Sequence, residues 1–125
     1  MSKPEREFFA VGEIPWTPSA GQVPELRERF LAVDDATGLA TSIMRFPPGT
    51  DTSANGAQAH DCWEEVLILE GAMTDLRLSR TFTAGMFACR PPGMEHGPWR
   101  SEDGCVTFQV RYRSPGARAG KAPQA

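Results

Sequence analysis

Short apolar runs, each bounded by glycine, proline or other turn-forming residues, recur along the middle of the chain. The clearest is Glu65-Val66-Leu67-Ile68-Leu69-Glu70, which we expect Gly71 to end. Apolar runs of four to eight residues between turn signals are typical of buried strands. Further short strands are predicted at intervals of about ten residues. They are residues 39–46, 76–78, 81–83, 86–90 and 106–113.

The segment 24–31 fits two structures. Pro24 at a first helical position favours a short helix, whereas the alternation from Leu26 to Phe30 fits one face of a strand. We favour the strand. The turn-forming residues 34–38 would then make it a hairpin partner of residues 39–46.

The regular spacing of short strands predicts one all-β domain, a small sandwich or barrel, over residues 26–113. Residues 1–25 are rich in proline and are predicted to form an extended N-terminal arm. Residues 50–57 are expected to form a polar loop. Residues 114–125 offer almost nothing to bury and are predicted to form a flexible tail.

Composition narrows the class of protein further. The 125 residues are 40% hydrophobic and 23% charged, which fits one globular domain and excludes wholesale disorder. A net charge of −3 provides no basic surface for nucleic acid. No apolar run is long enough to cross a bilayer, and the first residues lack the apolar segment of a signal peptide. We therefore expect a soluble, cytoplasmic protein without nucleic-acid or membrane partners.

Three cysteines, Cys62, Cys89 and Cys105, are odd in number and have no CxxC spacing. This pattern indicates neither a disulfide framework nor a zinc ribbon. We expect reduced thiols that pack as small apolar side chains.

The chain has only two histidines, and both are candidate ligands. His60 lies directly before the predicted strand 65–70, where Gln58 and His60 would project to one side of an extended chain and Glu64 could rejoin them after a bulge or turn. His96 follows the turn Pro91-Pro92-Gly93, which would aim its imidazole back into the barrel.

These residues resemble the two sequence motifs of the cupin family. The first motif corresponds to Gln58-x-His60-x3-Glu64-x6-Gly71. The second corresponds to Gly85-x5-Pro91-x-Gly93-x2-His96. The surrounding sequence is most similar to the branch typified by the cupin half of the ChrR anti-sigma factor. Small metal-dependent cupins such as acetylacetone dioxygenase have similar barrels.

The resemblance implies a cupin barrel, a double-stranded β-helix of two packed antiparallel sheets, and a homodimer. It also implies one divalent metal held by His60, Glu64 and His96, with Gln58 at the position of the family's first histidine. Arg100 likewise replaces an asparagine that often ends the second motif. A shifted register that pairs His60 with Cys62 would put Val66 where the glutamate belongs, so we exclude the thiol.

Two imidazoles and a carboxylate suit non-heme iron, and zinc, manganese, cobalt or nickel are also compatible. Gln58 offers a weak neutral oxygen instead of an imidazole, which should loosen the metal. Aromatic and arginine side chains near the motifs are candidates for a substrate pocket, because they could enclose an apolar body or bind a carboxylate or enolate. These are Arg45, Trp63, Phe87, Arg90 and Trp99.

The leading functional hypothesis is a metal-dependent, dioxygenase-like enzyme acting on a small molecule with a carbonyl or enolisable group. Two alternatives stay open: a non-catalytic zinc-binding or ligand-sensing module, and a metal-free cupin lyase or isomerase. An anti-sigma role in the ChrR branch needs an additional N-terminal helical domain, which we expect residues 1–25 to be too short to form.

Overall fold

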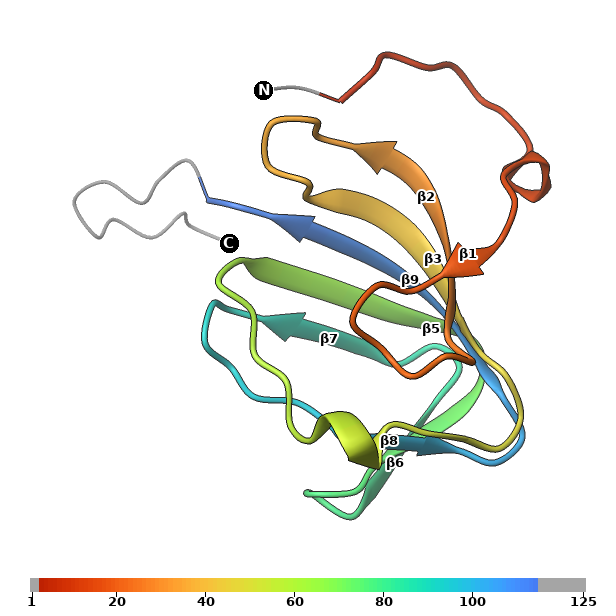
Figure 1. Cartoon of the computed structure of the whole chain (residues 1–125), viewed down its shortest axis with the longest axis vertical. Coiled ribbons are helices and arrows are strands. Elements are labelled where there is room, and N and C mark those ends of the chain that lie inside the picture. Colours follow the sequence, from red (N-terminus) through yellow and green to blue (C-terminus); the bar gives the residue numbers. More distant parts are fainter. Residues whose placement is uncertain (1–2, 115–125) are drawn as a thin grey trace.

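The computed structural model describes residues 3–114, whose regular secondary structure is almost entirely β-strand (Figure 1). Two short 3-10 helices, η1 (Val11–Glu13) and η2 (Ser53–Asn55), accompany the strands, and residues 3–114 contain no α-helix. No helix in this part of the chain could cross a membrane. The predicted all-β class is therefore confirmed.

The strands are β1 (Thr17–Pro18), β2 (Arg27–Val33), β3 (Ala40–Phe46), β4 (Thr50–Asp51), β5 (Trp63–Asp75), β6 (Arg80–Thr83), β7 (Phe87–Arg90), β8 (Trp99–Ser101) and β9 (Cys105–Tyr112).

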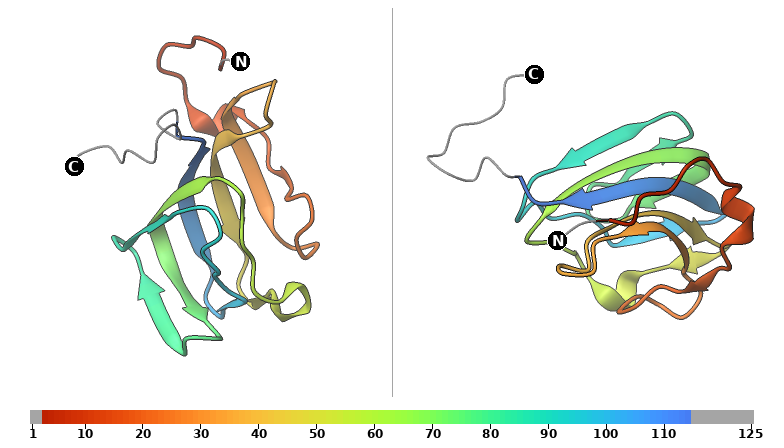
Figure 2. Two further views of the ribbon diagram at one scale, coloured as in Figure 1. Left: turned by 90° about the vertical axis from the view of Figure 1, so that its left-hand side faces the viewer. Right: turned by 90° about the horizontal axis from the view of Figure 1, so that it is seen from above.

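The strands form one antiparallel sheet that curls into a half-barrel (Figure 2). Their order is β1-β2-β3-β9-β5-β8-β4, and β6 and β7 also pair with β5. The first half of β5 pairs with β9 and β7, whereas its second half pairs with β6 and β8. The long strand β5 is thus shared by both layers of the half-barrel. The predicted hairpin of β2 and β3 is confirmed, with Arg27 opposite Arg45 and Val33 opposite Ala40.

Gly71 continues β5, so the prediction that it ends the strand is wrong. The pairing of β5 with β9 shifts register between Ile68 and Glu70, and Gly71 follows with φ +77°. Before this bulge Glu64, Val66 and Ile68 are buried, and after it Met73 and Asp75 are buried. An extra residue at a bulge changes which side chains face inward and bends the strand. The bulge and Gly71 therefore carry β5 from one layer to the other.

Residues 76–78 form a turn, so the predicted strand there is also wrong. The carboxylate of buried Asp75 accepts hydrogen bonds from the backbone N–H groups of Arg77 and Leu78, both at 2.9 Å. An aspartate side chain that accepts backbone N–H groups two and three residues ahead stabilises a turn. The apolar pattern in Leu-Arg-Leu was too short to reveal this competing interaction.

The region predicted as a polar loop, residues 50–57, contains β4 and η2. Thr50 and Thr52 are buried, because Thr50 lies opposite Ser101 of β8 and the hydroxyl of Thr52 accepts a hydrogen bond from the backbone N–H of Trp99. Neither β4 nor β8 was predicted. Both are two or three residues long, so no periodic pattern marks them.

The N-terminal region contributes to the fold through β1, which pairs with β2. Val23 also belongs to the apolar core, although the predicted boundary of the barrel lies at residue 26. Of the predicted C-terminal tail, residues 115–125 lie outside the described residues. The core lies between the two layers of the half-barrel. It comprises Val23, Leu26, Met44, Phe46, Ile68, Met73 and Cys105, with Phe82 and Trp99 packed against it.

The three cysteines are free, but they do not all pack in the interior. Cys62 and Cys105 are buried as expected, whereas Cys89 is exposed, which corrects the prediction for that residue. Cys89 lies on β7 opposite Glu65, on the outward face of the sheet. Burial raises the pKa of Cys105 to about 11 and also raises that of Cys62.

We expect one of the three thiols to react rapidly with Ellman's reagent in the native protein and all three in denaturant. The thiolate is the reactive form, and burial both hinders access and suppresses ionisation at Cys62 and Cys105. Cys89→Ser should reduce the rapid native reaction to about zero equivalents. Rapid reaction of two or three thiols in folded protein would contradict the packing described above.

Candidate metal centre

Two loops that are distant in sequence are joined side by side and carry the two histidines. Gln58 and His96 form an isolated β-bridge. The backbone N–H of Gln58 donates to the carbonyl oxygen of His96 at 2.7 Å, and the N–H of His96 donates to the carbonyl oxygen of Gln58 at 2.8 Å. The backbone N–H of Gly93 donates to the carbonyl of His60 at 2.8 Å. These three backbone hydrogen bonds bring the imidazoles of His60 and His96 together, with ring centroids 5.0 Å apart.

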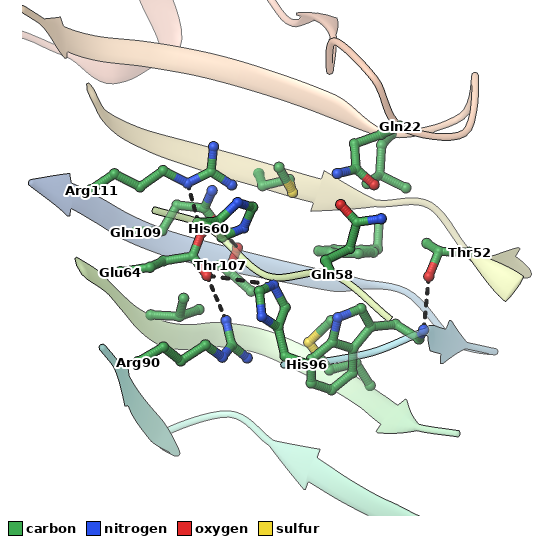
Figure 3. A pocket seen from close by; sticks show the side chains of 16 residues that line it. Gln22, Thr52, Gln58, His60, Glu64, Arg90, His96, Thr107, Gln109 and Arg111 are labelled. Carbon is green, nitrogen blue, oxygen red and sulfur yellow. Dashed lines mark hydrogen bonds and ion pairs between the residues drawn. The ribbon is translucent and has the colours of Figure 1, made fainter. Parts of the chain in front are cut away.

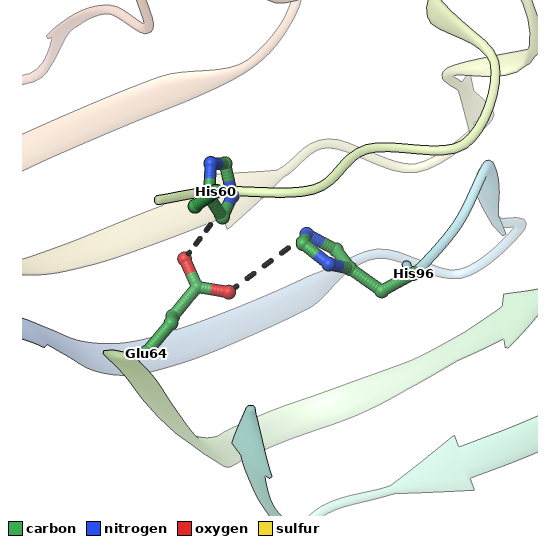
Figure 4. A group of neighbouring side chains, drawn as sticks. All are labelled: His60, Glu64 and His96. Atoms are coloured by element: carbon green, nitrogen blue, oxygen red, sulfur yellow. Dashed lines mark ion pairs between the residues drawn. The ribbon is translucent and has the colours of Figure 1, made fainter. Parts of the chain in front are cut away.

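Glu64 projects from β5 toward the two rings and turns one carboxylate oxygen to each (Figure 4). Its side chain is 3% exposed, because residue 64 is on the inward-facing set of β5. Nε2 of His60 is 3.7 Å from Oε2 of Glu64, and Nε2 of His96 is 3.8 Å from Oε1. One ligand atom from each of the three residues lies within 4.8 Å of the others. The structure therefore brings together three of the four predicted ligands.

Two arginines also converge on Glu64 (Figure 3). Arg90 of β7 and Arg111 of β9 lie directly opposite Glu64 on its two neighbouring strands. Nη1 of Arg90 donates to Oε1 of Glu64 and Nε of Arg111 donates to Oε2, both at 2.7 Å. Each carboxylate oxygen therefore accepts one charge-assisted hydrogen bond, and such bonds are stronger than neutral ones.

Arg111 was missed by the sequence analysis, although the sequence contains a partial signal for it. Thr107, Gln109 and Arg111 alternate along the last strand, and Thr107 and Gln109 are buried on the inward face. That alternation places Arg111 on the inward face too. Its position beside Glu64 depends on the register between β9 and β5, which the sequence does not show.

The electrostatics of the centre favour an anionic Glu64 and neutral histidines. Burial alone would raise the pKa of Glu64, but Arg111 and Arg90 outweigh it and lower that pKa below its ordinary value. Burial, reinforced by Arg90, lowers the pKa of His96 to about 4. Burial and Arg111 likewise lower the pKa of His60. At neutral pH both imidazoles thus have a free lone pair, which is the form that binds a metal.

The residues fit a divalent metal ion. The separations of 3.7 and 3.8 Å are too long for hydrogen bonds, and Nδ1 of buried His96 has no hydrogen-bond partner among residues 3–114. Ligand atoms about 2.0–2.2 Å from one ion lie roughly 3–3.5 Å apart. The two separations between Glu64 and the histidines therefore need only a small contraction, and no two of the three ligand atoms are more than 4.8 Å apart. Each Glu64 oxygen uses one lone pair to accept a hydrogen bond from an arginine, and its second lone pair is free to bind a metal ion.

Gln58 lies beside this group and lines the same cavity. Its side-chain amide nitrogen donates to the backbone carbonyl of Asn55 at 3.1 Å, and its oxygen accepts no hydrogen bond within the described residues. The structure thus places the amide at the cavity wall, as a fourth polar group next to the two histidines and Glu64. Whether it ligates a metal stays a prediction.

The cavity beside the three residues has a volume of about 50 Å³, enough for an ion and one or two waters. His60, Gln58 and Arg111 also border an outer hollow of about 320 Å³ between β2, β3 and the loop leading to β5. On the other side, Arg90, His96 and Trp99 border a mostly apolar hollow of about 140 Å³. The centre therefore has space for an organic ligand on two sides.

The structure separates the predicted pocket residues into three groups. Arg90 and Trp99 line the cavity, with the Arg90 guanidinium carbon 5.5 Å from the Trp99 ring centroid. Phe87 is 61% exposed and lines only the apolar hollow. Arg45 is exposed on β3, and Trp63 stacks on Tyr112 at 6.3 Å between centroids. Arg45 and Trp63 are thus not brought to the cavity, because both occupy outward-facing positions of their strands.

Three solved structures of similar fold are distant in sequence. An RmlC-like cupin from Shewanella frigidimarina is 18% identical, with TM-score 0.68, and the match covers 93% of this chain and 97% of that one. An acetylacetone dioxygenase from Acinetobacter johnsonii is 16% identical, with TM-score 0.66 and coverage of 89% and 75%. A chain in the structure of Rhodobacter sphaeroides SigE in complex with the anti-sigma ChrR is 19% identical, with TM-score 0.61, and the match covers 82% of this chain and 52% of that one. These likenesses show the cupin fold, as predicted.

Among curated proteins, none matches the chain. A family model does match, described as the ChrR cupin-like domain, and it spans residues 4–114. This match covers nearly the whole chain and includes both histidine-bearing loops and the strand that carries Glu64. The protein therefore belongs to the ChrR cupin-like family.

Proposed function

We propose that this protein is a metal-dependent cupin enzyme that acts on a small organic molecule with a carbonyl or enolisable group. The observation that carries the proposal is the buried convergence of His60, Glu64 and His96, with one ligand atom of each within 4.8 Å of the others. Two neutral imidazoles and one carboxylate are the ligand set associated with non-heme iron oxygenases. Oxygen-dependent cleavage of a carbon–carbon bond is the reaction we favour.

His60, Glu64 and His96 would hold one divalent ion, with Gln58 beside it. When bound, such an ion supplies polarisation of carbonyl or enolate oxygens and, if it is iron, reactivity towards dioxygen. The arginines keep Glu64 ionised and fix its orientation through one hydrogen bond to each oxygen. Val66, Met73 and Trp99, which line both the cavity and the apolar hollow, would exclude water from an apolar part of the substrate.

The acetylacetone dioxygenase of similar fold supports this proposal only as an analogy, because one fold can serve many reactions. Membership of the ChrR cupin-like family favours a second function, in which the site binds zinc and senses a ligand without turnover. The metal-free lyase or isomerase is the third alternative. The homodimer and the cytoplasmic location expected from the sequence stay predictions.

Elemental analysis of the purified protein, followed by anaerobic loading with Fe(II) and oxygen uptake with small β-diketones and hydroxyaryl ketones, tests the proposal. We expect about one divalent ion per chain and substrate-dependent oxygen uptake. Wild-type protein without substrate and an equally treated His60→Ala variant control for oxidation by free iron. Stoichiometric zinc with no uptake after iron loading would favour the sensing module, and a turnover-competent protein without metal would favour the lyase or isomerase.

A further inference from the structure

Positive charge exceeds negative charge at the inner cavity. Three residues with formal charges line it within residues 3–114: Glu64, Arg90 and Arg111. Two guanidinium groups therefore face one carboxylate, and this surplus exists whether the histidines are neutral or charged. A divalent ion at the proposed site would increase it. A surplus of charge on partly buried groups is costly unless a counter-charge accompanies it, so the cavity as built favours an anion.

Both guanidinium groups retain donors that can bind that anion. Arg90 and Arg111 each use one nitrogen on Glu64 and make no other hydrogen bond within the described residues. Their side chains are 12% and 30% exposed, and both line the cavity (Figure 3). A guanidinium has five N–H donors in a planar fork that matches a carboxylate, so each arginine can bind Glu64 and a second carboxylate together.

The outer hollow indicates what the rest of the ligand is like. Arg111, His60 and Glu28 of β2 all line it. The carboxylate of Glu28 is buried, accepts hydrogen bonds from Ser19 at 3.0 Å and Ser42 at 2.7 Å, and has no ion-pair partner within residues 3–114. A second negative charge on the ligand would meet this carboxylate at low dielectric, where like charges repel strongly.

We propose that Arg90 and Arg111 bind the carboxylate of the substrate, so that the natural ligand is a small monocarboxylate whose other functional groups, including the reacting carbonyl, are uncharged. This inference rests on the proposed function, because it names the substrate class of the same site. The competing view is that both arginines only hold Glu64 in place. In that case the protein would bind no free carboxylate.

Binding to metal-free protein separates these views without any catalytic readout. Pyruvate and its neutral amide, pyruvamide, have nearly the same shape and differ in one charge. Titration calorimetry, with intrinsic tryptophan fluorescence as a second signal, should show pyruvate binding about tenfold or more tightly than pyruvamide. Added NaCl should weaken pyruvate binding. Equal binding of the two compounds, or no pyruvate binding, would overturn the proposal. If 2-oxoglutarate, a dianion, binds as tightly as pyruvate, the preference for a single charge is wrong.

Variants then locate the anion. Arg90→Gln and Arg111→Gln should each weaken pyruvate binding about tenfold, because each removes a charged donor. Arg113→Gln is the matched control, since Arg113 is half-exposed and pairs with exposed Asp61, and it should bind pyruvate like wild type. Unchanged affinity in both cavity variants, with melting temperatures near wild type, would overturn the assignment. If either variant fails to fold, the comparison of pyruvate with pyruvamide on wild-type protein still decides whether the site binds a carboxylate.

Failure of this inference is distinguishable from failure of the proposed function. Metal binding and oxygen uptake without carboxylate binding would retain the enzyme and refute the anion site. Carboxylate binding by a protein that takes up no metal would retain the anion site and refute the metal-dependent enzyme.

Discussion

Replacing His96 by alanine is expected to abolish the proposed metal binding and, with it, the proposed metal-dependent turnover. Within residues 3–114, His96 supplies one of the three strong ligand groups at the site, and its Nε2 lies 3.8 Å from Glu64. Loss of groups that merely support a ligand costs about 10–100-fold in metal affinity, so loss of a ligand itself should cost about 100-fold or more. Competition with a chromogenic chelator, together with elemental analysis, would measure the change.

His60→Ala should have the same effect, because the only other histidine in the chain, His96, is itself one of the proposed ligands. Gln58→His is the complementary variant. It restores an imidazole at the family's first histidine position, so it should tighten binding of a late divalent metal such as zinc. Melting temperatures of all three variants would show whether the fold is retained. Wild-type metal content in folded His96→Ala would refute the proposed ligand set.

Gly71→Ala is expected to cause the largest loss of stability among single methyl additions at the glycines within residues 3–114. A Cβ atom at residue 71 would lie 2.0 Å from the backbone oxygen of Gly104 and 3.0 Å from Cα of Cys105. The φ angle of +77° adds a strain of about 1–2 kcal/mol for a residue with a side chain. Because the clash is with backbone, the strands themselves must move.

We therefore expect Gly71→Ala to reduce the free energy of unfolding by about 3 kcal/mol or more. Gly85→Ala is the matched control, since Gly85 has φ +91° but a methyl group added there would meet nothing within 4 Å. It should cost only about 1–2 kcal/mol. At about 4 °C per kcal/mol for a chain of this size, thermal unfolding followed by circular dichroism separates the two cases. Equal melting temperatures would mean that residues 71 and 104 are not in this close approach.

Part of the candidate site was predictable because its signals are local. The spacings around His60, Glu64 and His96 identified both loops, and turn-forming residues before His96 explain how the chain reverses there. Strands β3, β7 and β9 were predicted close to their observed bounds, because each contains a run of apolar residues between turn signals. Family resemblance then supplied what spacing alone does not, namely that the two loops meet.

Other features depended on contacts between distant residues. Arg111 and Glu64 are 47 positions apart and meet only through the register of β9 on β5. The side chain of Asp75 turns the following residues away from a strand, and it also accepts a hydrogen bond from the backbone N–H of Gly97. From the sequence alone, Gly71 is expected to end a strand. In the structure β5 continues through it, and the missing side chain lets the backbone of Gly104 pack against residue 71.

The amino-acid sequence by itself determined the all-β class, the strand-forming segments and the three side chains with metal-binding chemistry, because strand propensity, turn chemistry and ligand type are properties of short stretches. Only the tertiary structure decided that two guanidinium groups share Glu64 and which strand passes from one layer to the other. Pairing register between strands is a long-range property: a shift of one residue turns every side chain to the opposite face, and no local pattern specifies which partner lies across the ladder.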